Sequence, residues 1–337
     1  MINATNKNFT ATMQEKNPLL SQIGNTPLVQ LDLPTEATVY AKLEFLNPGG
    51  SIKDRAALYM VQDAEERGLL KPGGTIVEGS SGNQGIALAM IGAVKGYRVI
   101  IVVPKHTSTE KKAALRAYGA ELHVAPDASS HDDPDSYSKR AQTLAEEIPG
   151  AFMPNQYYNV KNAEAHYRST GPEIWAQTDG TITHFFCGMG SCGTISGTSK
   201  FLKEQNHNIH ITGADSAHSL LSAKTPRAYA VEGIGVDVIS DVLQRDLVDT
   251  IVPVYDEQAF QTARDYARKG YLVGPSSGAV LHALTTQLHH LKRGDTAVCI
   301  LADSGRAYLS KLFSVQMSAA DLEAYREEDT REQQPAR

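Results

Sequence analysis

Cysteine is scarce in this sequence. The 337 residues contain three cysteines, Cys187, Cys192 and Cys299, an odd number with no Cys-x-x-Cys spacing. A disulfide-stabilised scaffold and a structural zinc site both need more cysteines in closer pairs. We therefore expect neither, and we expect a reducing compartment, the cytoplasm.

Long apolar runs and basic stripes are also missing. The longest apolar segments, 86–94 and 99–103, fall well short of the ~18 residues that cross a membrane. The net charge is −6, from 32 Lys and Arg against 38 Asp and Glu. The sequence therefore predicts no membrane partner and no nucleic-acid partner. The polar residues 1–17 lack the apolar core of an export signal.

Histidine is more frequent, at 11 residues, but the histidines are scattered. His282, His289 and His290 share a predicted helix that has no carboxylate pattern beside them. We interpret all three as surface residues and expect no metal site.

Strand-like and helix-like segments alternate along the rest of the chain. The strand-like segments are 38–46, 75–77, 98–103, 183–187, 209–214 and 296–301, and the helical stripes are 57–64, 86–93, 194–204 and 280–291. Thr107-x-x-Glu110 resembles a capping box and predicts a helix start. Such alternation predicts parallel sheets covered by helices on both faces. In these folds ligands bind at loops that follow the carboxyl ends of strands.

The first of these loops contains a lysine. It reads Asn47-Pro-Gly-Gly-Ser-Ile-Lys53-Asp-Arg55, in which the glycines allow a tight turn and Ser51 can cap the next helix. Lys53 lies in the first helical turn, where the helix dipole disfavours a cation and lowers the pKa of an amine. That placement suits a Schiff-base lysine. The alternative is a solvated surface lysine.

The second and third loops indicate anion sites at helix starts. The second reads Glu78-Gly-Ser80-Ser81-Gly82-Asn83-Gln84-Gly85 and suits a carboxylate or a phosphate, although an ordinary serine-rich turn is the alternative. The third, Gly188-Met-Gly190-Ser191-Cys192-Gly193-Thr194, can cradle a phosphate. It also matches G-x-G-x-x-G, with Asp215 after the next strand, so an NAD-dependent oxidoreductase is a second interpretation. Cys192 is either a thiol of lowered pKa or a small space-filling residue.

Together these segments resemble the fold type II pyridoxal-phosphate enzymes, in the group of cysteine synthase and cystathionine β-synthase. The matching motifs occur in the family's order, as IGNTPLV, KLEFLNPGGSIKDR, SSGNQGIALA, NQYYNVKNAEAHY, TGPEIW, the glycine loop, EGIG, PSSGA and ILADSGRAYLSK. The resemblance implies an α/β fold of two domains, similar to the tryptophan synthase β subunit. Each domain has a mostly parallel twisted sheet flanked by helices.

The resemblance also implies a domain division. Residues 18–46 and 158–316 would form a large domain that binds pyridoxal 5'-phosphate, and residues 47–157 a small mobile domain that binds substrate. Residues 1–17 are interpreted as a flexible leader and 317–337 as an acidic tail. A homodimer is implied by the family.

The resemblance assigns roles to particular residues. Lys53 would hold the cofactor covalently and act as the catalytic acid–base group. The further cofactor ligands would be Asn83 at the phenolic oxygen, Gly190, Ser191, Cys192, Gly193 and Thr194 at the phosphate, and Ser276 at the pyridine nitrogen. The substrate ligands would be Ser80, Ser81, Gln84 and Gln156 at the α-carboxylate, and Gly233 near the amine.

The implied reaction is a β-replacement on serine or an O-activated serine, through an aminoacrylate intermediate. Sulfide or a thiol adds, which gives cysteine or cystathionine. A neutral serine beside the pyridine nitrogen makes the cofactor a milder electron sink, which suits β-elimination. Ser80 and Gln84 stand where the family usually has threonine, so serine, O-acetylserine and phosphoserine all stay open as first substrates. A non-catalytic pyridoxal-phosphate-binding scaffold is a further alternative.

Overall fold

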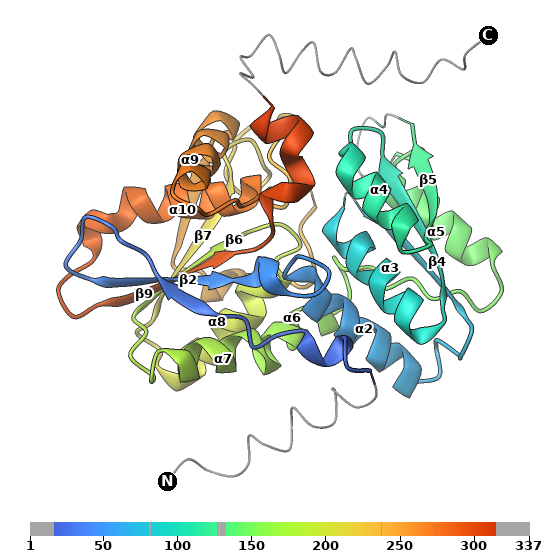
Figure 1. Ribbon diagram of the computed structural model, residues 1–337, viewed down its shortest axis with the longest axis horizontal. Helices are drawn as coiled ribbons and strands as arrows, with labels where there is room; N and C mark the ends of the chain where they lie inside the picture. Colours follow the sequence, from blue (N-terminus) through green and yellow to red (C-terminus); the bar gives the residue numbers. More distant parts are fainter. Residues whose placement is uncertain (1–16, 81, 127, 129–132, 237, 315–337) are drawn as a thin grey trace.

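The computed structural model describes residues 17–314 except 81, 127, 129–132 and 237 (Figure 1). The acidic tail and all of the leader except residue 17 lie outside the described residues. The chain forms two sheets, a six-stranded one on the left of Figure 1 and a three-stranded one on the right. No helix in the described part is both long and apolar enough to cross a membrane.

The six-stranded sheet is parallel except at one edge. Its strands are β1 (Leu28–Gln30), β2 (Thr38–Leu43), β6 (His184–Gly188), β7 (His210–Ser216), β8 (Thr250–Val254) and β9 (Thr296–Leu301). They lie in the order β1-β2-β9-β6-β7-β8, with β1 antiparallel to β2. Edge strand β8 contains the exposed Pro253.

Helices cover both faces of this sheet. Helices α9 (Asp256–Arg268) and α10 (Pro275–Gln287) lie on one face, and α6 (Lys161–Arg168), α7 (Thr170–Gln177) and α8 (Gly193–Gln205) lie on the other. Neighbouring residues of a strand point to opposite faces. Accordingly Phe186 packs toward α10 and Phe185 packs toward α8, which is why β6 reads as a continuous apolar run.

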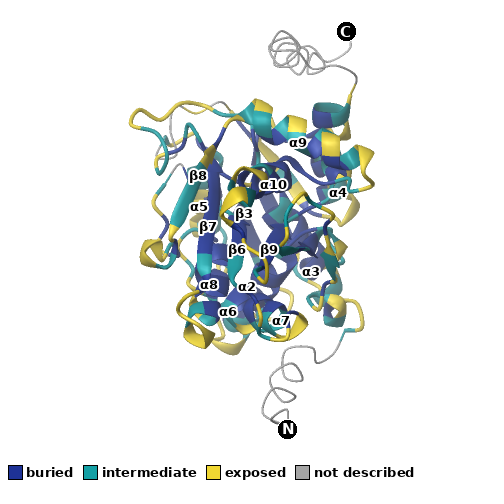
Figure 2. Ribbon diagram, turned by 90° about the vertical axis from the view of Figure 1, so that its left-hand side faces the viewer, coloured by how far each residue is buried: buried dark blue, intermediate teal, exposed yellow. Residues whose placement is uncertain are grey.

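The three-stranded sheet has the same layered construction. Strands β3 (Thr75–Gly79), β4 (Arg98–Pro104) and β5 (Glu121–Ala125) are parallel, and Phe152 pairs with the free side of β3. Helices α2 (Lys53–Glu66), α3 (Asn83–Lys95) and α4 (Thr109–Ala117) share one apolar core, and α5 (Tyr137–Glu147) packs on the opposite face. Figure 2 shows buried residues filling both layers, with exposed residues on outer helix faces and loops.

The predicted α/β class is confirmed, and some predicted element bounds are wrong. The strand predicted over 38–46 ends at Leu43, because Glu44 turns inward to pair with Arg55 and starts a 3-10 helix. The capping box predicted from Thr107 is also wrong. Ser108 caps α4, and its hydroxyl accepts a hydrogen bond from the Lys111 amide. The short helical turns are Leu20–Gln22, Glu44–Leu46, Arg245–Leu247, Leu288–His290, Gly305–Tyr308 and Leu309–Phe313.

Candidate functional site

Lys53 is the first residue of α2, and the loop that joins β2 to α2 leads directly to it. The hydroxyl of Ser51, the predicted cap, accepts a hydrogen bond from the Lys53 amide at 3.2 Å, although Ile52 occupies the cap position itself. The Lys53 amine donates to Ser191 Oγ at 3.2 Å. Burial is the largest cause that lowers the pKa of this amine, and Cys187 opposes the shift. A neutral amine in a cavity is the form that attacks a carbonyl.

The glycine loop runs from β6 into α8 and is supported by α6. Asn162 on α6 donates from Nδ2 to Ser191 Oγ at 3.0 Å and to the Gln156 carbonyl at 2.8 Å. A Cβ at Gly193 would collide with Asn162 Oδ1, so this position requires glycine. The Thr194 hydroxyl is hydrogen bonded to His166 Nε2 at 3.2 Å. The loop therefore presents hydroxyls at the N-terminus of α8, where an anion binds favourably.

Cys192 has the left-handed backbone that usually selects glycine, with φ of 65°. Its thiol is buried and donates to the Gly190 carbonyl at 3.3 Å. Burial raises the pKa of this thiol to about 12, and Asp215 adds to the shift. Burial and the raised pKa argue against the activated-thiol interpretation of Cys192 and favour the space-filling one.

The serine-rich loop joins β3 to α3, whose first residue is Asn83. The Ser80 hydroxyl accepts hydrogen bonds from the amides of Gly82 at 3.2 Å and Gly85 at 3.1 Å, which closes the loop. Asn83 Nδ2 donates to Asp303 Oδ2 at 2.7 Å. Ser81 lies outside the described residues.

Gln84 and Gln156 are both buried beside this loop. Neither Nε2 nor Oε1 of Gln84 has a hydrogen-bond partner among the described residues. The backbone amide of Gln156 donates to Glu78 Oε1 at 3.4 Å. Burying the side-chain amide of Gln84 without a hydrogen-bond partner costs stability. Such a group suggests that Gln84 binds a ligand.

Ser276 and Gly233 meet on the large-sheet side of the site. Ser276 is buried in the first turn of α10. Gly233 has a left-handed φ of 89°, and a Cβ there would lie 3.1 Å from Ser276 Oγ. A Cβ at Gly190 would approach the Gly233 carbonyl to 2.7 Å. Close packing and backbone conformation therefore both require these glycines.

One cavity gathers most of these residues from both sheets. Its lining consists of Ile52, Lys53, Asn83, Cys187, Gly188, Gly190, Ser191, Cys192, Thr194, Gly233, Ser276, Val280, Ile300 and Ala302. Four residues of the expected site, Ser80, Gln84, Gln156 and Gly193, do not line it. The cavity lies at the carboxyl ends of β2, β6 and β9, where parallel sheets bind ligands.

Residues far apart in sequence support this cavity and were not assigned a role from sequence. Asn162 and His166 lie four residues apart on α6 and both contact the glycine loop. Arg55 pairs with Glu44 at 2.8 Å and Glu173 at 2.6 Å, which fixes the first turn of α2. The i, i+4 spacing of Asn162 and His166 was the sequence feature that could have indicated that they lie on one face of a helix.

Asp215 is unsuited to the role that the dinucleotide interpretation gives it. Its carboxylate is fully buried and accepts hydrogen bonds from the hydroxyls of Ser219 and, at 2.6 Å, Ser222. A carboxylate that binds the ribose of a dinucleotide must be accessible to it. This contact argues against the NAD-dependent interpretation.

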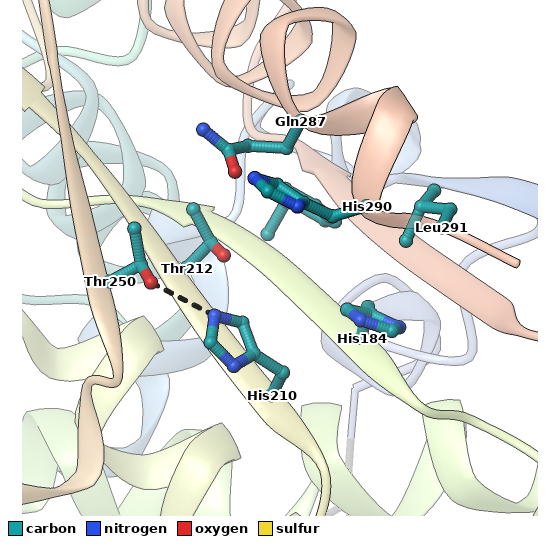
Figure 3. Close-up of a pocket in the computed structure, with 8 residues that line it drawn as sticks. His184, His210, Thr212, Thr250, Gln287, His290 and Leu291 are labelled. Atoms are coloured by element: carbon teal, nitrogen blue, oxygen red, sulfur yellow. Dashed lines mark hydrogen bonds between the residues drawn. The ribbon is translucent and has the colours of Figure 1, made fainter.

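A second cavity lies at the other end of the large sheet (Figure 3). Its lining consists of His184, Phe186, His210, Thr212, Thr250, Gln287, His290 and Leu291. His210 Nε2 is hydrogen bonded to Thr250 Oγ1 at 2.9 Å. Across the described part of the chain, no group of three or more His, Cys, Asp or Glu side chains is arranged to hold a metal ion. His289 and His290 are exposed as predicted, and His282 is half-buried.

Comparison with known proteins gives a consistent result. Residues 19–303 match the family model described as "Pyridoxal-phosphate dependent enzyme". The chain is 42% identical to a cystathionine beta-synthase of Apis mellifera over 93% of this chain and 66% of that protein. It is 40% identical to cysteine synthase 1 of Neurospora crassa, over 88% of this chain and 83% of that protein. The chain thus spans slightly less than two thirds of the Apis mellifera protein.

A solved structure agrees with these sequence matches. It is an O-acetylserine dependent cystathionine beta-synthase from Helicobacter pylori, with a TM-score of 0.82 and 36% sequence identity. The match covers 88% of this chain and 98% of that one.

Proposed function

Because the chain belongs to the pyridoxal-phosphate dependent enzyme family that includes cystathionine β-synthase and cysteine synthase, we propose that it catalyses a β-replacement on an amino acid. Serine or an O-activated serine loses its β-substituent and gains sulfide or a thiol, which gives cysteine or cystathionine. One observation carries the proposal. Lys53, whose amine has a lowered pKa, lines the same cavity as the glycine loop, which leads into the N-terminus of α8.

The cavity has the donor set that pyridoxal phosphate requires. The Lys53 amine suits the aldehyde, and the α8 N-terminus with the Ser191 and Thr194 hydroxyls suits the phosphate. Ser276 offers a neutral hydroxyl for the ring nitrogen, and Asn83 an amide for the phenolic oxygen. When bound, the cofactor supplies an electron sink for negative charge at the substrate α-carbon.

The residues of the chain then divide the remaining work. Lys53 takes the α-proton and returns it, because its lowered pKa keeps the free amine available as a base. Ser191 accepts a hydrogen bond from the free Lys53 amine and so orients it. The α3 N-terminus, with Ser80, Ser81 and the unpartnered amide of Gln84, binds the α-carboxylate together with Gln156. Gly233 leaves room for the substrate amine.

Absorption and product analysis together test the proposal. The purified chain reconstituted with pyridoxal phosphate should absorb visible light, and Lys53→Ala should abolish both this band and turnover. O-acetylserine, serine and phosphoserine are then added separately, each with sulfide or homocysteine, and cysteine and cystathionine are quantified. A colourless protein that binds NAD would contradict the proposal. A coloured protein that turns over none of these substrates would indicate a binding scaffold.

We propose three further properties. Residues 47–157 form a small domain that moves on substrate binding, and the polar contacts of α4 with residues 307–310 support this. The protein is a homodimer, as expected from the family, which light scattering tests. It is cytoplasmic, because all three cysteines are free and buried.

A further inference from the structure

Asp303 lies where three loops of the site converge. It follows β9, and its carbonyl accepts a hydrogen bond from the Gly274 amide at 3.1 Å, at the start of the helix that carries Ser276. Asp303 also pairs through its backbone with Ser51, in the loop that leads to Lys53. Its backbone therefore joins the Lys53 and Ser276 segments.

The Asp303 side chain reaches the third segment, which carries Asn83. Its Oδ2 atom accepts hydrogen bonds from Asn83 Nδ2 at 2.7 Å and from the Tyr308 hydroxyl at 2.5 Å. Its Oδ1 atom has no hydrogen-bond partner among the described residues, and it lies where a Cβ of Gly274 would be. The carboxylate is buried and packed on both sides, so it is held in one orientation.

Charged groups surround this carboxylate. Burial raises the pKa of Asp303, and Lys111 opposes the shift most strongly. The Lys111 amine lies 4.3 Å from the centre of the Tyr308 ring and pairs with Glu232 Oε2 at 2.5 Å. Lys111 opposes this shift without reversing it, and Oδ2 accepts the hydrogen bond from the Asn83 amide whether or not Oδ1 carries a proton.

The two ends of an asparagine amide have similar shapes and opposite hydrogen-bonding character. A free Asn83 could turn either its oxygen or its nitrogen toward the cavity. Because Asp303 is an acceptor, it binds the nitrogen end and fixes the amide orientation. Asn83 lines the cavity, so the second N–H of the same nitrogen can face a ligand bound there. A donor suits an anionic oxygen on a ligand.

We propose that Asp303 is a positioning residue, which with Tyr308 fixes the Asn83 amide so that it presents a donor to the phenolic oxygen of the cofactor. This inference rests on the proposed function. It is distinct from a merely structural role, because it predicts that Asp303 acts through Asn83.

The test uses the full chain reconstituted with pyridoxal phosphate. The variants are Asp303→Ala, Asp303→Asn, Tyr308→Phe, Asn83→Ala and the double variant Asn83→Ala/Asp303→Ala. Cofactor occupancy, the position of the cofactor absorption band and kcat are measured for each variant. Loss of the hydrogen bond that orients Asn83 predicts that kcat falls about tenfold in Asp303→Ala. The absorption band should move in the same direction as in Asn83→Ala.

The remaining variants identify the route of the effect. The double variant should match Asn83→Ala within about twofold, because coupled residues are not additive. Asp303→Asn keeps an acceptor oxygen and should keep the wild-type band, whereas Tyr308→Phe should show a smaller shift in the same direction. If Asp303→Ala does not fold, the position of the absorption band in Tyr308→Phe tests the inference instead.

Two outcomes would overturn the inference. One is a wild-type band in Asp303→Ala at normal occupancy, or in Tyr308→Phe where the first variant does not fold. The other is a double variant whose kcat falls by the product of the two single effects. Failure of the proposed function is separate, because it shows as an absent cofactor band in the wild-type chain.

Discussion

Lys53 and Cys192 line the same cavity, and burial shifts the pKa of each toward its neutral form. The consequences are opposite. A neutral amine is a nucleophile, whereas a neutral thiol is unreactive. Residue type alone leaves both side chains as candidates for chemistry. Their common environment separates them, and that environment is a property of the folded chain.

The three cysteines provide a direct check on burial. Cys187, Cys192 and Cys299 are all buried, and burial is the largest cause that raises the pKa of each thiol, for Cys192 and Cys299 to about 12. We expect the native protein to be nearly inert to a thiol reagent at pH 8 and the urea-unfolded protein to react fully. Absorbance of the released reagent measures both. Rapid modification of a native thiol would contradict this expectation.

The buried side-chain amide of Gln84 should lower the stability of the protein and strengthen substrate binding. Replacing its buried, unpartnered amide by a side chain of similar volume, in Gln84→Leu, should raise the free energy of unfolding by about 1 kcal/mol. The KM for the first substrate should rise about tenfold, because a carboxylate contact is lost. Urea unfolding and steady-state kinetics measure the two effects. The exposed Gln142, changed to Leu, is the control and should alter neither. Unchanged stability together with unchanged KM would exclude this role.

At the scale of elements, buried ion pairs join helix α2 to its neighbours. Arg55 on α2 contacts Glu44, directly after β2, and Glu173 on α7, and Lys42 of β2 reaches Glu173 at 2.7 Å. The side chain of Arg55 is almost completely buried. The pairing holds the first turn of α2, and therefore Lys53, against the large sheet.

Removing one partner of this network should be costly. Glu173→Ala leaves Arg55 and Lys42 with one carboxylate fewer, so the free energy of unfolding should fall by about 3 kcal/mol. Glu164→Ala, on the neighbouring α6 with more exposed partners, should cost less than about 1 kcal/mol. Urea denaturation of both variants gives the comparison. Equal losses would show that the network contributes no more than a surface pair.

The elements that sequence predicted are those with one strong pattern. The apolar run over 296–301 coincides with β9, and the stripe over 194–204 lies within α8. Strand β5 was not predicted, because Glu121 and His123 give it an exposed, polar appearance. Helix α9 was not predicted either, because its buried side is built mainly from alanines.

The loops of the site were predictable from their glycines, serines and lysine. Their support was not, because it comes from distant segments. Asn162, His166 and Asp303 act through contacts that span 28 to 220 residues of sequence. Such contacts depend on how the helices pack, which no local pattern records.

At the scale of the whole molecule, ion pairs at one rim of the site connect the elements around the small sheet with those around the large sheet. Lys111 of α4 and Lys311 near the end of the described chain both pair with Glu232, at 2.5 and 2.9 Å. Ser310 Oγ donates to Glu110 Oε2 at 2.9 Å. Polar pairs of this kind separate and re-form without repacking an apolar core, as the proposed movement of the small domain requires.

Glu232 makes this contact sensitive to acid. Burial alone would raise the pKa of Glu232, but Lys111 and Lys311 outweigh it and lower the pKa to about 2, from an ordinary value of 4.5. The stability from Glu232 is therefore complete above pH 4.5 and is lost as the pH falls toward 2. Glu232→Gln should lower stability at pH 7 by about 3 kcal/mol and flatten its pH dependence in this window.

Chemical denaturation at a series of pH values measures this effect. Glu121→Gln, in an exposed pair with Arg98, is the control and should change this dependence much less. An unchanged slope between pH 4.5 and 2 in Glu232→Gln would show that the rim contact adds nothing to stability.

The proline in β8 has a consequence for how this protein behaves at high concentration. A sheet border with regular N–H groups is a template on which other chains stack, and proline removes one of those donors. Pro253 lies in the outermost strand, so a newcomer cannot add a continuous ladder there. The proline therefore protects the β8 edge of the large sheet against the fibril-like addition of further strands.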